Sequence, residues 1–327
     1  RILLFTHPFR DKSLTFAKNL NAHDMKKFIL SILAIAAMAS CTKTSEDDVD
    51  PNVPVEIKFG AGIDMLSRAA ITTDGSGHPV SNITSIQILR GTDGANPAFN
   101  TISDVTTTAD LKTDGTFENI INPQYYKSTT DAANFIAYWP QGLLTSGTVN
   151  FTITGEEDII VAPAIATTYS TTPPTVNFQF AHKLAQLQLK VIAQNESAFS
   201  FYGVLESAKI NVPSKLDMTI KADGSTELTA NATPTNIDLD FGSVTYSTTE
   251  TSASKNFIIL PVAPTTINLK FANITEAKDY DIKDLALLPG KITTLTITVN
   301  ATGVNFSSTI TEWTTGGTDG KTNVGGN

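Results

Sequence analysis

Few residues of this chain have the types and the spacing that catalysis requires. Among its 327 residues there are four histidines, of which two lie beyond position 40, and a single cysteine. One cysteine cannot form an intrachain disulfide, and two histidines far apart in sequence offer little for metal binding or proton transfer. Gly320-Lys321-Thr322 matches the end of a phosphate-binding loop, but Thr315 stands where that motif needs glycine. We therefore expect no enzyme, no cofactor and no metal site.

The charge of the chain argues against nucleic acid as a partner. The formal charge is −9, although the first forty residues hold six bases and only two acids. From Cys41 onward, 17 basic residues face 30 acidic ones, which gives that part a formal charge of −13. An acidic surface is repelled by phosphate backbones, so we expect no nucleic-acid binding.

The context of the single cysteine predicts lipid attachment. Two lysines at 26–27 precede an almost unbroken apolar run over residues 28–38, and two small residues then lead to Cys41. At about 1.5 Å per residue, this run is too short to span a hydrocarbon core of about 30 Å, so it predicts a signal peptide. Small residues before a cysteine resemble the bacterial lipobox, where cleavage precedes lipidation (palmitate among the acyl groups). We predict a lipoprotein signal peptide at residues 25–40, with an ordinary signal peptide as the alternative.

The segments on either side of the signal peptide have simpler interpretations. Residues 1–24 precede an n-region that starts naturally at Met25, so we interpret them as upstream sequence or a misplaced start. Residues 42–54 are polar and acidic, which predicts a solvated tether between lipid and fold. An acidic cluster directly after a lipidated cysteine also resembles the surface-export signal of Bacteroidales lipoproteins.

Strict alternation predicts the first strand. Eleven residues alternate between apolar and polar or small side chains, which is the pattern of a strand with one buried face. The apolar positions are Val53, Val55, Ile57, Phe59, Ala61 and Ile63. We assign residues 41–68 to the tether together with this strand.

Arg68 follows the first strand and is the candidate processing site. Beyond the signal peptide, Arg68 and Arg90 are the only arginines. Arg90 ends the apolar segment 83–89 and is expected to be held in a strand, which leaves Arg68 to an Arg-specific protease. Cleavage would make Ala69 the new first residue and detach lipid, tether and strand together. A groove that loses its strand exposes apolar walls and unpaired backbone groups, which favours strand addition from another chain. A plain first strand followed by an incidental arginine is the alternative.

The remainder of the chain predicts β-sandwiches. No long amphipathic helical pattern occurs beyond Ala69, and short alternating segments recur between turn residues. Such segments lie at 149–153, 185–191, 216–220, 237–241, 267–271 and 295–299. Asp223-Gly224 lies between residues 218–220 and residues 227–229, which predicts a hairpin.

A Pro-containing stretch at 167–174 is the best candidate for a linker. It divides the chain into an N-terminal module, residues 69–174, and a C-terminal module, residues 175–327. The Gly/Thr-rich tail from residue 314 lacks alternation and is expected to be flexible.

Several motifs in order along the chain resemble one family, the fimbrillins, which are the type V pilins of Bacteroidales. They are the lipobox at Cys41, the first strand followed by Ser67-Arg68-Ala69, the segment Asp158 to Pro163, Val176 to Ala185, Leu288 to Lys291, and Ile310 to Trp313. The resemblance covers essentially residues 41–313.

Membership would imply two tandem transthyretin-like β-sandwich domains, preceded by a lipoprotein signal peptide. It would also imply outer-membrane export, removal of the first strand by an Arg-specific protease, and donor-strand exchange with other pilin subunits in a surface fimbrium. The donor would lie near the carboxy terminus, where Val304, Phe306 and Ile310 alternate, although this segment could instead belong to the second module's own sheet.

We therefore expect a structural fimbrial subunit that contributes to cell adhesion, whether major or minor. The first alternative is a lipoprotein of the cell surface that binds glycan or another host or bacterial ligand without polymerising, or a tip or anchor subunit. A hydrolase would need a pair of carboxylates, which sequence spacing does not reveal.

Overall fold

The structure, a computed structural model, describes residues 54–63, 78–79, 81–99, 107–170, 172, 174–239, 242–282 and 285–312. Nearly every element in these ranges is a β-strand, so the all-β prediction is confirmed. The signal peptide, Cys41, Val53, Arg68 and Ala69 lie outside the described residues.

One short helix in the described ranges escaped prediction. It is α2 (Glu196–Tyr202), and the side chain of Asn195 caps its start by accepting a hydrogen bond from the Ala198 N–H at 2.9 Å. Seven residues are too few to show a helical period in the sequence. None of the helical segments described is long and apolar enough to cross a membrane.

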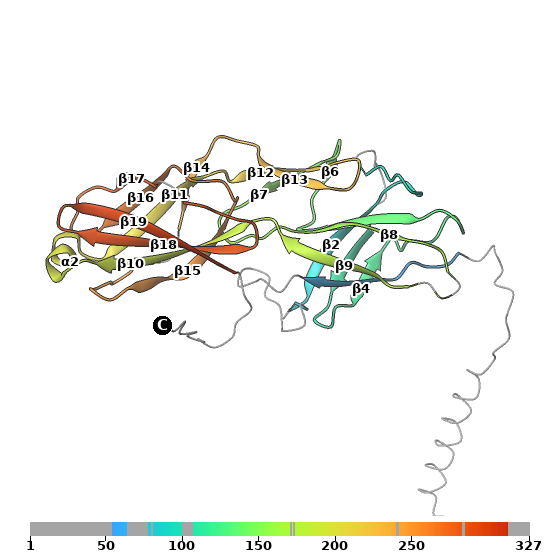
Figure 1. The fold of residues 1–327 in the computed structure, drawn as a ribbon, viewed down its shortest axis with the longest axis horizontal. Helices are drawn as coiled ribbons and strands as arrows, with labels where there is room; N and C mark the ends of the chain where they lie inside the picture. Colours follow the sequence, from blue (N-terminus) through green and yellow to red (C-terminus); the bar gives the residue numbers. More distant parts are fainter. Residues whose placement is uncertain are drawn as a thin grey trace, which may run out of the picture. The chain divides into compact units, whose positions relative to one another are not determined.

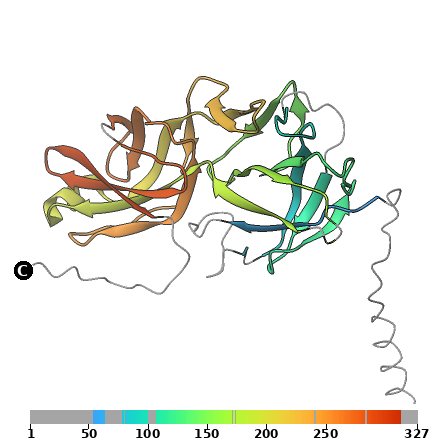
Figure 2. The same cartoon turned by 45° about the vertical axis from the view of Figure 1, so that its right-hand side comes forward.

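A seven-stranded sheet contains the first strand (Figure 1). In spatial order its strands are β1 (Phe59–Ile63), β9 (Val176–His182), β8 (Ile160–Thr167), β5 (Ala133–Trp139), β2 (Ile83–Arg90), β3 (Thr107–Leu111) and β4 (Phe117–Ile121). In both views the blue first strand lies beside β9 (Figure 2).

Three four-stranded sheets contain the other strands described. The first is β13 (Thr226–Ala230), β12 (Lys215–Ile220), β7 (Thr148–Thr152) and β6 (Leu144–Thr145). The second is β15 (Thr251–Ile259), β10 (Ala185–Ala193), β18 (Lys291–Asn300) and β19 (Gly303–Glu312). The third is β14 (Thr235–Asp238), β11 (Leu205–Val212), β16 (Thr266–Phe271) and β17 (Lys278–Asp281).

The buried side chains form distinct core clusters. Core 1 lies between the two sheets that contain β10 and β11. Core 2 contains the inward side chains of β1 and its neighbours, and core 3 lies between the seven-stranded sheet and the sheet of β7 and β12. Strand β5 serves both of the latter, because Phe135 and Ala137 belong to core 2 while Ile136 and Tyr138 belong to core 3. Burial on both faces explains why residues 135–139 of this strand form a continuous apolar run.

The strand pairing adds detail to the predicted organisation. The hairpin at Asp223-Gly224 is confirmed, because β12 and β13 pair in antiparallel fashion around it. The division at residue 174 stays a prediction. Across it, β9 pairs with β8 and β1, so the predicted linker connects two strands of one sheet.

Candidate functional site

The site that the sequence singled out is the groove that holds the first strand, here called the first-strand seat. Ile57, Phe59, Ala61 and Ile63 are buried in core 2, and Val55 packs half-buried against it. The alternation predicted for these five positions is therefore confirmed.

On one side, the seat is a parallel ladder. Strand β1 pairs with β9 at five positions, starting with Phe59 opposite Val176. Strand β1 is shorter than the predicted strand of residues 53–63. Its partner β9 begins only at Val176, after Pro174, which has no N–H to donate. Upstream of Phe59, an isolated bridge joins Glu56 to Tyr125.

On the other side, separate backbone contacts replace a ladder. The Ile57 N–H donates to the Gln124 carbonyl at 2.8 Å, and the Ala61 N–H donates to the Gly115 carbonyl at 2.9 Å. Gly115 has a φ of +79°, and a Cβ atom there would lie 2.8 Å from the Ala61 carbonyl oxygen. Only glycine fits this close approach without strain.

A charged turn fixes Gly115 in this position. The Asp114 carboxylate accepts hydrogen bonds from the Thr116 hydroxyl at 2.5 Å and from the Thr116 N–H at 2.9 Å. These two bonds lower the pKa of Asp114 to about 2. The Asp114 carboxylate therefore stays ionised at any ordinary pH, so that it can keep accepting both hydrogen bonds.

Aromatic rings line the bottom of the seat. The Phe59 ring meets Phe135 edge-on at a centroid distance of 5.1 Å and stacks on Phe178 at 5.7 Å. Phe178 in turn contacts Phe117 and Phe180 at 6.4 and 6.1 Å. Phe59 thus anchors the first strand in a cluster of aromatic rings.

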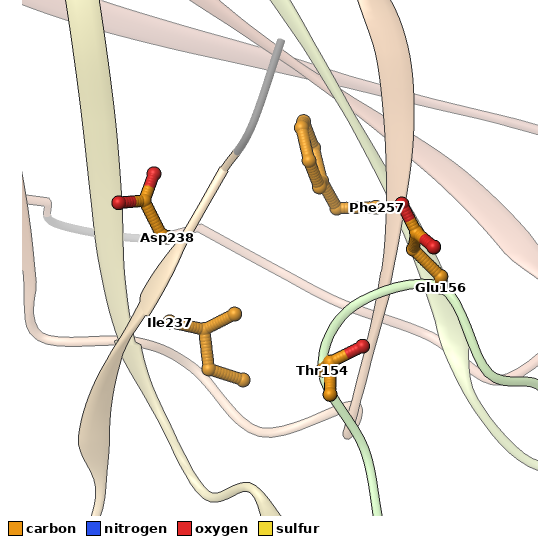
Figure 3. Close-up of a pocket in the computed structure, with 5 residues that line it drawn as sticks. All are labelled: Thr154, Glu156, Ile237, Asp238 and Phe257. Atoms are coloured by element: carbon orange, nitrogen blue, oxygen red, sulfur yellow. The ribbon is translucent and has the colours of Figure 1, made fainter.

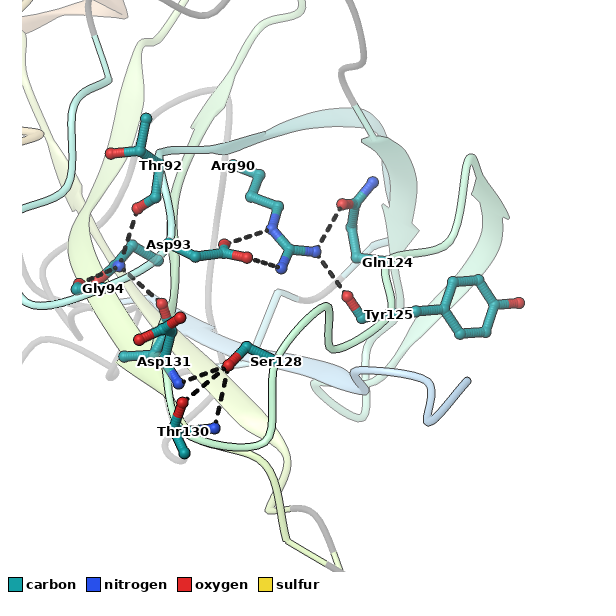
Figure 4. Close-up of polar contacts among 11 residues, drawn as sticks. Arg90, Thr92, Asp93, Gly94, Gln124, Tyr125, Ser128, Thr130 and Asp131 are labelled. Carbon is teal, nitrogen blue, oxygen red and sulfur yellow. Dashed lines mark hydrogen bonds and ion pairs between the residues drawn. The ribbon is translucent and has the colours of Figure 1, made fainter. Parts of the chain in front are cut away.

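Arg90, the second of the two arginines beyond residue 40, is held as the sequence predicted. It ends β2, and its side chain is only 7% exposed. Its guanidinium forms two bonds to the Asp93 carboxylate, at 2.9 and 3.0 Å, and a 2.7 Å bond to the Tyr125 carbonyl (Figure 4). The next N–H, that of Gly91, donates to the Asn134 carbonyl at 2.9 Å. The peptide bond after Arg90 is therefore part of the sheet.

We expect an Arg-specific protease to leave the bond between Arg90 and Gly91 intact in the folded chain. A protease must draw an extended segment into its own cleft, which here would break sheet bonds and a bidentate ion pair. Limited digestion followed by intact-mass measurement checks this. A fragment starting at Gly91 that appears as fast as one starting at Ala69 would contradict this prediction. Digestion in denaturant is the control, because the bonds after Arg68 and after Arg90 should then both be cut.

The predicted donor residues lie in β19 at the edge of its sheet, where β19 pairs with β18 over ten positions. Val304 and Phe306 pack half-buried against core 1, and Ile310 is 42% exposed. The structure thus places this segment in the sheet of β10 and β18, as the alternative had it, and does not place it in the first-strand seat.

A buried pair of polar side chains fixes the end of β9. His182 Nδ1 lies 2.6 Å from Asp158 Oδ2, and the other carboxylate oxygen accepts a hydrogen bond from the Ile159 N–H at 2.8 Å. Both side chains are almost fully buried. The partner of His182 was missed in the sequence because Asp158 ends an acidic run, Glu156-Glu157-Asp158, that looks like a solvated turn.

We expect Asp158→Asn to lower the free energy of unfolding by about 1–3 kcal/mol, because an uncharged amide cannot accept the imidazole N–H as a carboxylate does. Urea titration followed by fluorescence measures this. The neighbouring Glu156→Gln, on an exposed side chain, should stay within about 0.5 kcal/mol of the parent. Equal effects of the two substitutions would contradict a special role for the buried pair.

A separate cavity of about 410 Å³ opens between β14, β15 and the loop before β8. Ile237 and Phe257 form its apolar floor, and Thr154, Glu156 and Asp238 form its polar rim (Figure 3). Lys255 lies 3.2 Å from Glu156, and Lys209 lies 3.5 Å from Asp238. Within the described ranges, no three His, Cys, Asp or Glu side chains are grouped so that they could hold a metal ion.

Comparison with known sequences identifies relatives. A sequence model described as fimbrillin-like matches residues 70–313. A candidate fimbrium subunit of Bacteroides uniformis, Fim1C, is 26% identical over 339 aligned positions, which cover 91% of this chain and 99% of that protein.

Solved structures share the fold. A candidate cell adhesion protein from Bacteroides uniformis superimposes with a TM-score of 0.53 at 20% identity, covering 79% of this chain and 98% of the other. Another, from Bacteroides ovatus, gives 0.53 at 16% identity, covering 81% and 100%. At these identities the likeness shows a shared fold.

Proposed function

The chain belongs to the fimbrillin-like family, and from this premise we propose that it is a structural subunit of a surface fimbrium whose first strand is a removable plug. The observation that carries the proposal is the first-strand seat, where a short segment next to the predicted cleavage site completes a hydrophobic core. The match to the family model starts at residue 70, two residues after Arg68, and does not include the plug.

The energetics suit a plug that is stable until it is cut. Full burial of Ile57, Phe59 and Ile63 contributes roughly 5–9 kcal/mol as an upper estimate. Holding two separate chains together costs about 4–15 kcal/mol in lost translational and rotational freedom. While the strand is covalently attached, this cost is absent and the strand stays seated. Once it is cut, the two terms are comparable and the strand can leave.

In this scheme, the chain is exported as a lipoprotein through Cys41 and reaches the outer membrane with its plug in place. An Arg-specific protease then cuts after Arg68, the strand of residues 53–63 leaves with the lipid, and the vacated seat accepts a strand from another pilin subunit. The burial of Arg90 and the hydrogen bond of Gly91 within the sheet support Arg68 as the cleavage site. The role is one of assembly and adhesion, and the scheme gives the chain no catalytic step.

The mature amino terminus tests the scheme. In cell-surface material, Edman or mass-spectrometric sequencing should find Ala69. A lipid-modified Cys41 in assembled fibres would contradict it and would favour an anchored protein that binds a ligand, for which the cavity at Phe257 is a candidate site.

A further inference from the structure

The first strand is held in its seat in two sections. The downstream section, residues 59–63, forms the parallel ladder with β9. The upstream section, residues 55–57, lies against residues 122–126, which directly follow β4 and are here called the strap. An isolated antiparallel bridge between Glu56 and Tyr125 is the centre of this contact. The two sections therefore depend on different parts of the fold.

Two backbone hydrogen bonds flank this bridge. The Ile57 N–H donates to the Gln124 carbonyl at 2.8 Å, and the Tyr126 N–H donates to the Val55 carbonyl at 3.0 Å. Ile57 is buried in core 2, and Val55 packs half-buried against it. The strap is thus the backbone partner of the upstream section, and how well it holds that section depends on how firmly the strap itself is fixed.

Arg90 fixes the strap from its other side. Tyr125 occupies a non-hydrogen-bonded position of the bridge, so its carbonyl points away from the first strand. The Arg90 guanidinium donates to this carbonyl at 2.7 Å, and its two bonds to the Asp93 carboxylate set its orientation (Figure 4). The guanidinium also lies 5.6 Å from the centre of the Phe135 ring, which meets Phe59. Arg90 therefore takes the place that a further strand would have behind the strap.

The strap has further supports, and these come from neutral side chains. The Thr107 hydroxyl donates to the Asn122 carbonyl at 2.8 Å, and the Tyr126 hydroxyl lies 2.7 Å from the Thr167 hydroxyl. A hydrogen bond from a charged donor is roughly twice as strong as one between neutral groups. The bond from Arg90 is therefore the strongest of these supports, and it acts directly at the bridge to the first strand.

We propose that Arg90 is a positioning residue for the first strand, which keeps the upstream section in its seat by fixing the strap through the Tyr125 carbonyl. The inference rests on the plug proposed above and names the residue that controls how fast the plug leaves after cleavage. In that scheme the lipid is attached at Cys41, so the upstream section is the end of the plug that stays connected to the membrane. The strap determines when this end is free.

Arg90→Lys tests the bond to the strap selectively. The lysine keeps a positive charge in the same surroundings, but its compact ammonium lacks the span of a guanidinium and cannot donate to Asp93 and Tyr125 at once. The control variant is Lys190→Met, which removes a partly exposed ion pair with Glu250 in a different sheet. Urea denaturation of both variants checks that they are folded.

Site-resolved amide hydrogen exchange of the uncut chain is the first measurement, and it does not depend on cleavage. In Arg90→Lys, the N–H groups of Ile57 and Tyr126 should exchange about ten to a hundred times faster than in the parent, because a hydrogen bond from a charged group is lost. The Ala61 N–H, in the downstream section, should exchange as it does in the parent and in Lys190→Met. Equal acceleration at Ala61, or none at Ile57 and Tyr126, would overturn the positioning role.

Asp93→Asn is the second variant, which decides the matter if the lysine variant does not fold. An amide cannot form the bidentate ion pair, so the guanidinium of Arg90 is less well oriented toward the strap. The N–H groups of Ile57 and Tyr126 should again exchange faster, by a smaller factor than in Arg90→Lys, while Ala61 stays as in the parent. Unchanged exchange at the first two positions would count against the proposal.

Release of the plug after cleavage is the second measurement. The full chain is cut with an Arg-specific protease, and mass spectrometry follows the free fragment that ends at Arg68. Arg90→Lys should release this fragment on the order of tenfold faster than the parent does. Equal rates would overturn control of release by Arg90. A parent whose fragment never leaves would refute the removable plug itself, whereas the exchange pattern of the uncut chain would still decide whether Arg90 positions the strap.

Discussion

Cells that carry Arg68→Ala should display no fimbrial ladder, while the subunit itself is exported and folded. Without the cut, the first strand remains covalently tethered to its seat, where burial of its apolar side chains is not opposed by the entropy of dissociation. The loss should be complete on gels of unheated surface material, because each subunit would then carry a filled groove. Immunoblots of whole cells measure the amount exported.

Arg68→Lys is the matched control for this result. It keeps the positive charge and the length of the side chain but is not recognised by an Arg-specific protease, so it should behave as alanine does. Normal ladders in the lysine variant together with none in the alanine variant would show that charge at this position, and not cleavage, is what matters. Ladders in both would remove Arg68 from the mechanism.

Phe59→Ala should lower the unfolding free energy of the unprocessed chain by about 3–5 kcal/mol. The substitution empties the site between Phe135 and Phe178 and leaves a cavity in core 2. Urea denaturation of the uncut chain gives the value. Since the strand would also be held less tightly, the cut variant should release it faster, which mass spectrometry of the supernatant detects.

Lys58→Ala is the control at the neighbouring position. Lys58 is exposed on the opposite face of the same strand, so its removal should change the unfolding free energy by less than about 0.5 kcal/mol. A small effect of both substitutions would mean that the first strand contributes little to the fold, and the idea of a plug would lose its physical basis.

The sequence predicted local structure well where side chains alternate. The alternation at residues 55–63 and the hairpin at Asp223-Gly224 both depend on neighbours along the chain, and both are found in the structure. The confinement of Arg90 was predictable in the same way, since an apolar run leads directly into it. Its partners Gln124 and Tyr125 were not, because they lie more than thirty residues away.

What the sequence could not reveal is pairing at a distance. Asp158 and His182 are 24 residues apart and form a pair only because β8 and β9 are neighbours. The pairing of β9 with both β8 and β1 also joins segments that are distant in sequence, and the stretch before β9 looked like a linker. Proline-rich composition indicates a break in regular structure but carries no information on which sheet the next strand joins.

The two-sided burial of β5 has a consequence for the subunit between release of one strand and capture of the next. Phe135 loses its contact with Phe59 when the plug departs. Ile136 and Tyr138, on the opposite face of β5, still pack in core 3 and hold the backbone of the strand in place. The packing of core 3 against β5 should therefore keep the empty first-strand seat from collapsing. Little reorganisation would then precede docking, so the encounter of two subunits, rather than refolding of either, should set the pace of fibre growth.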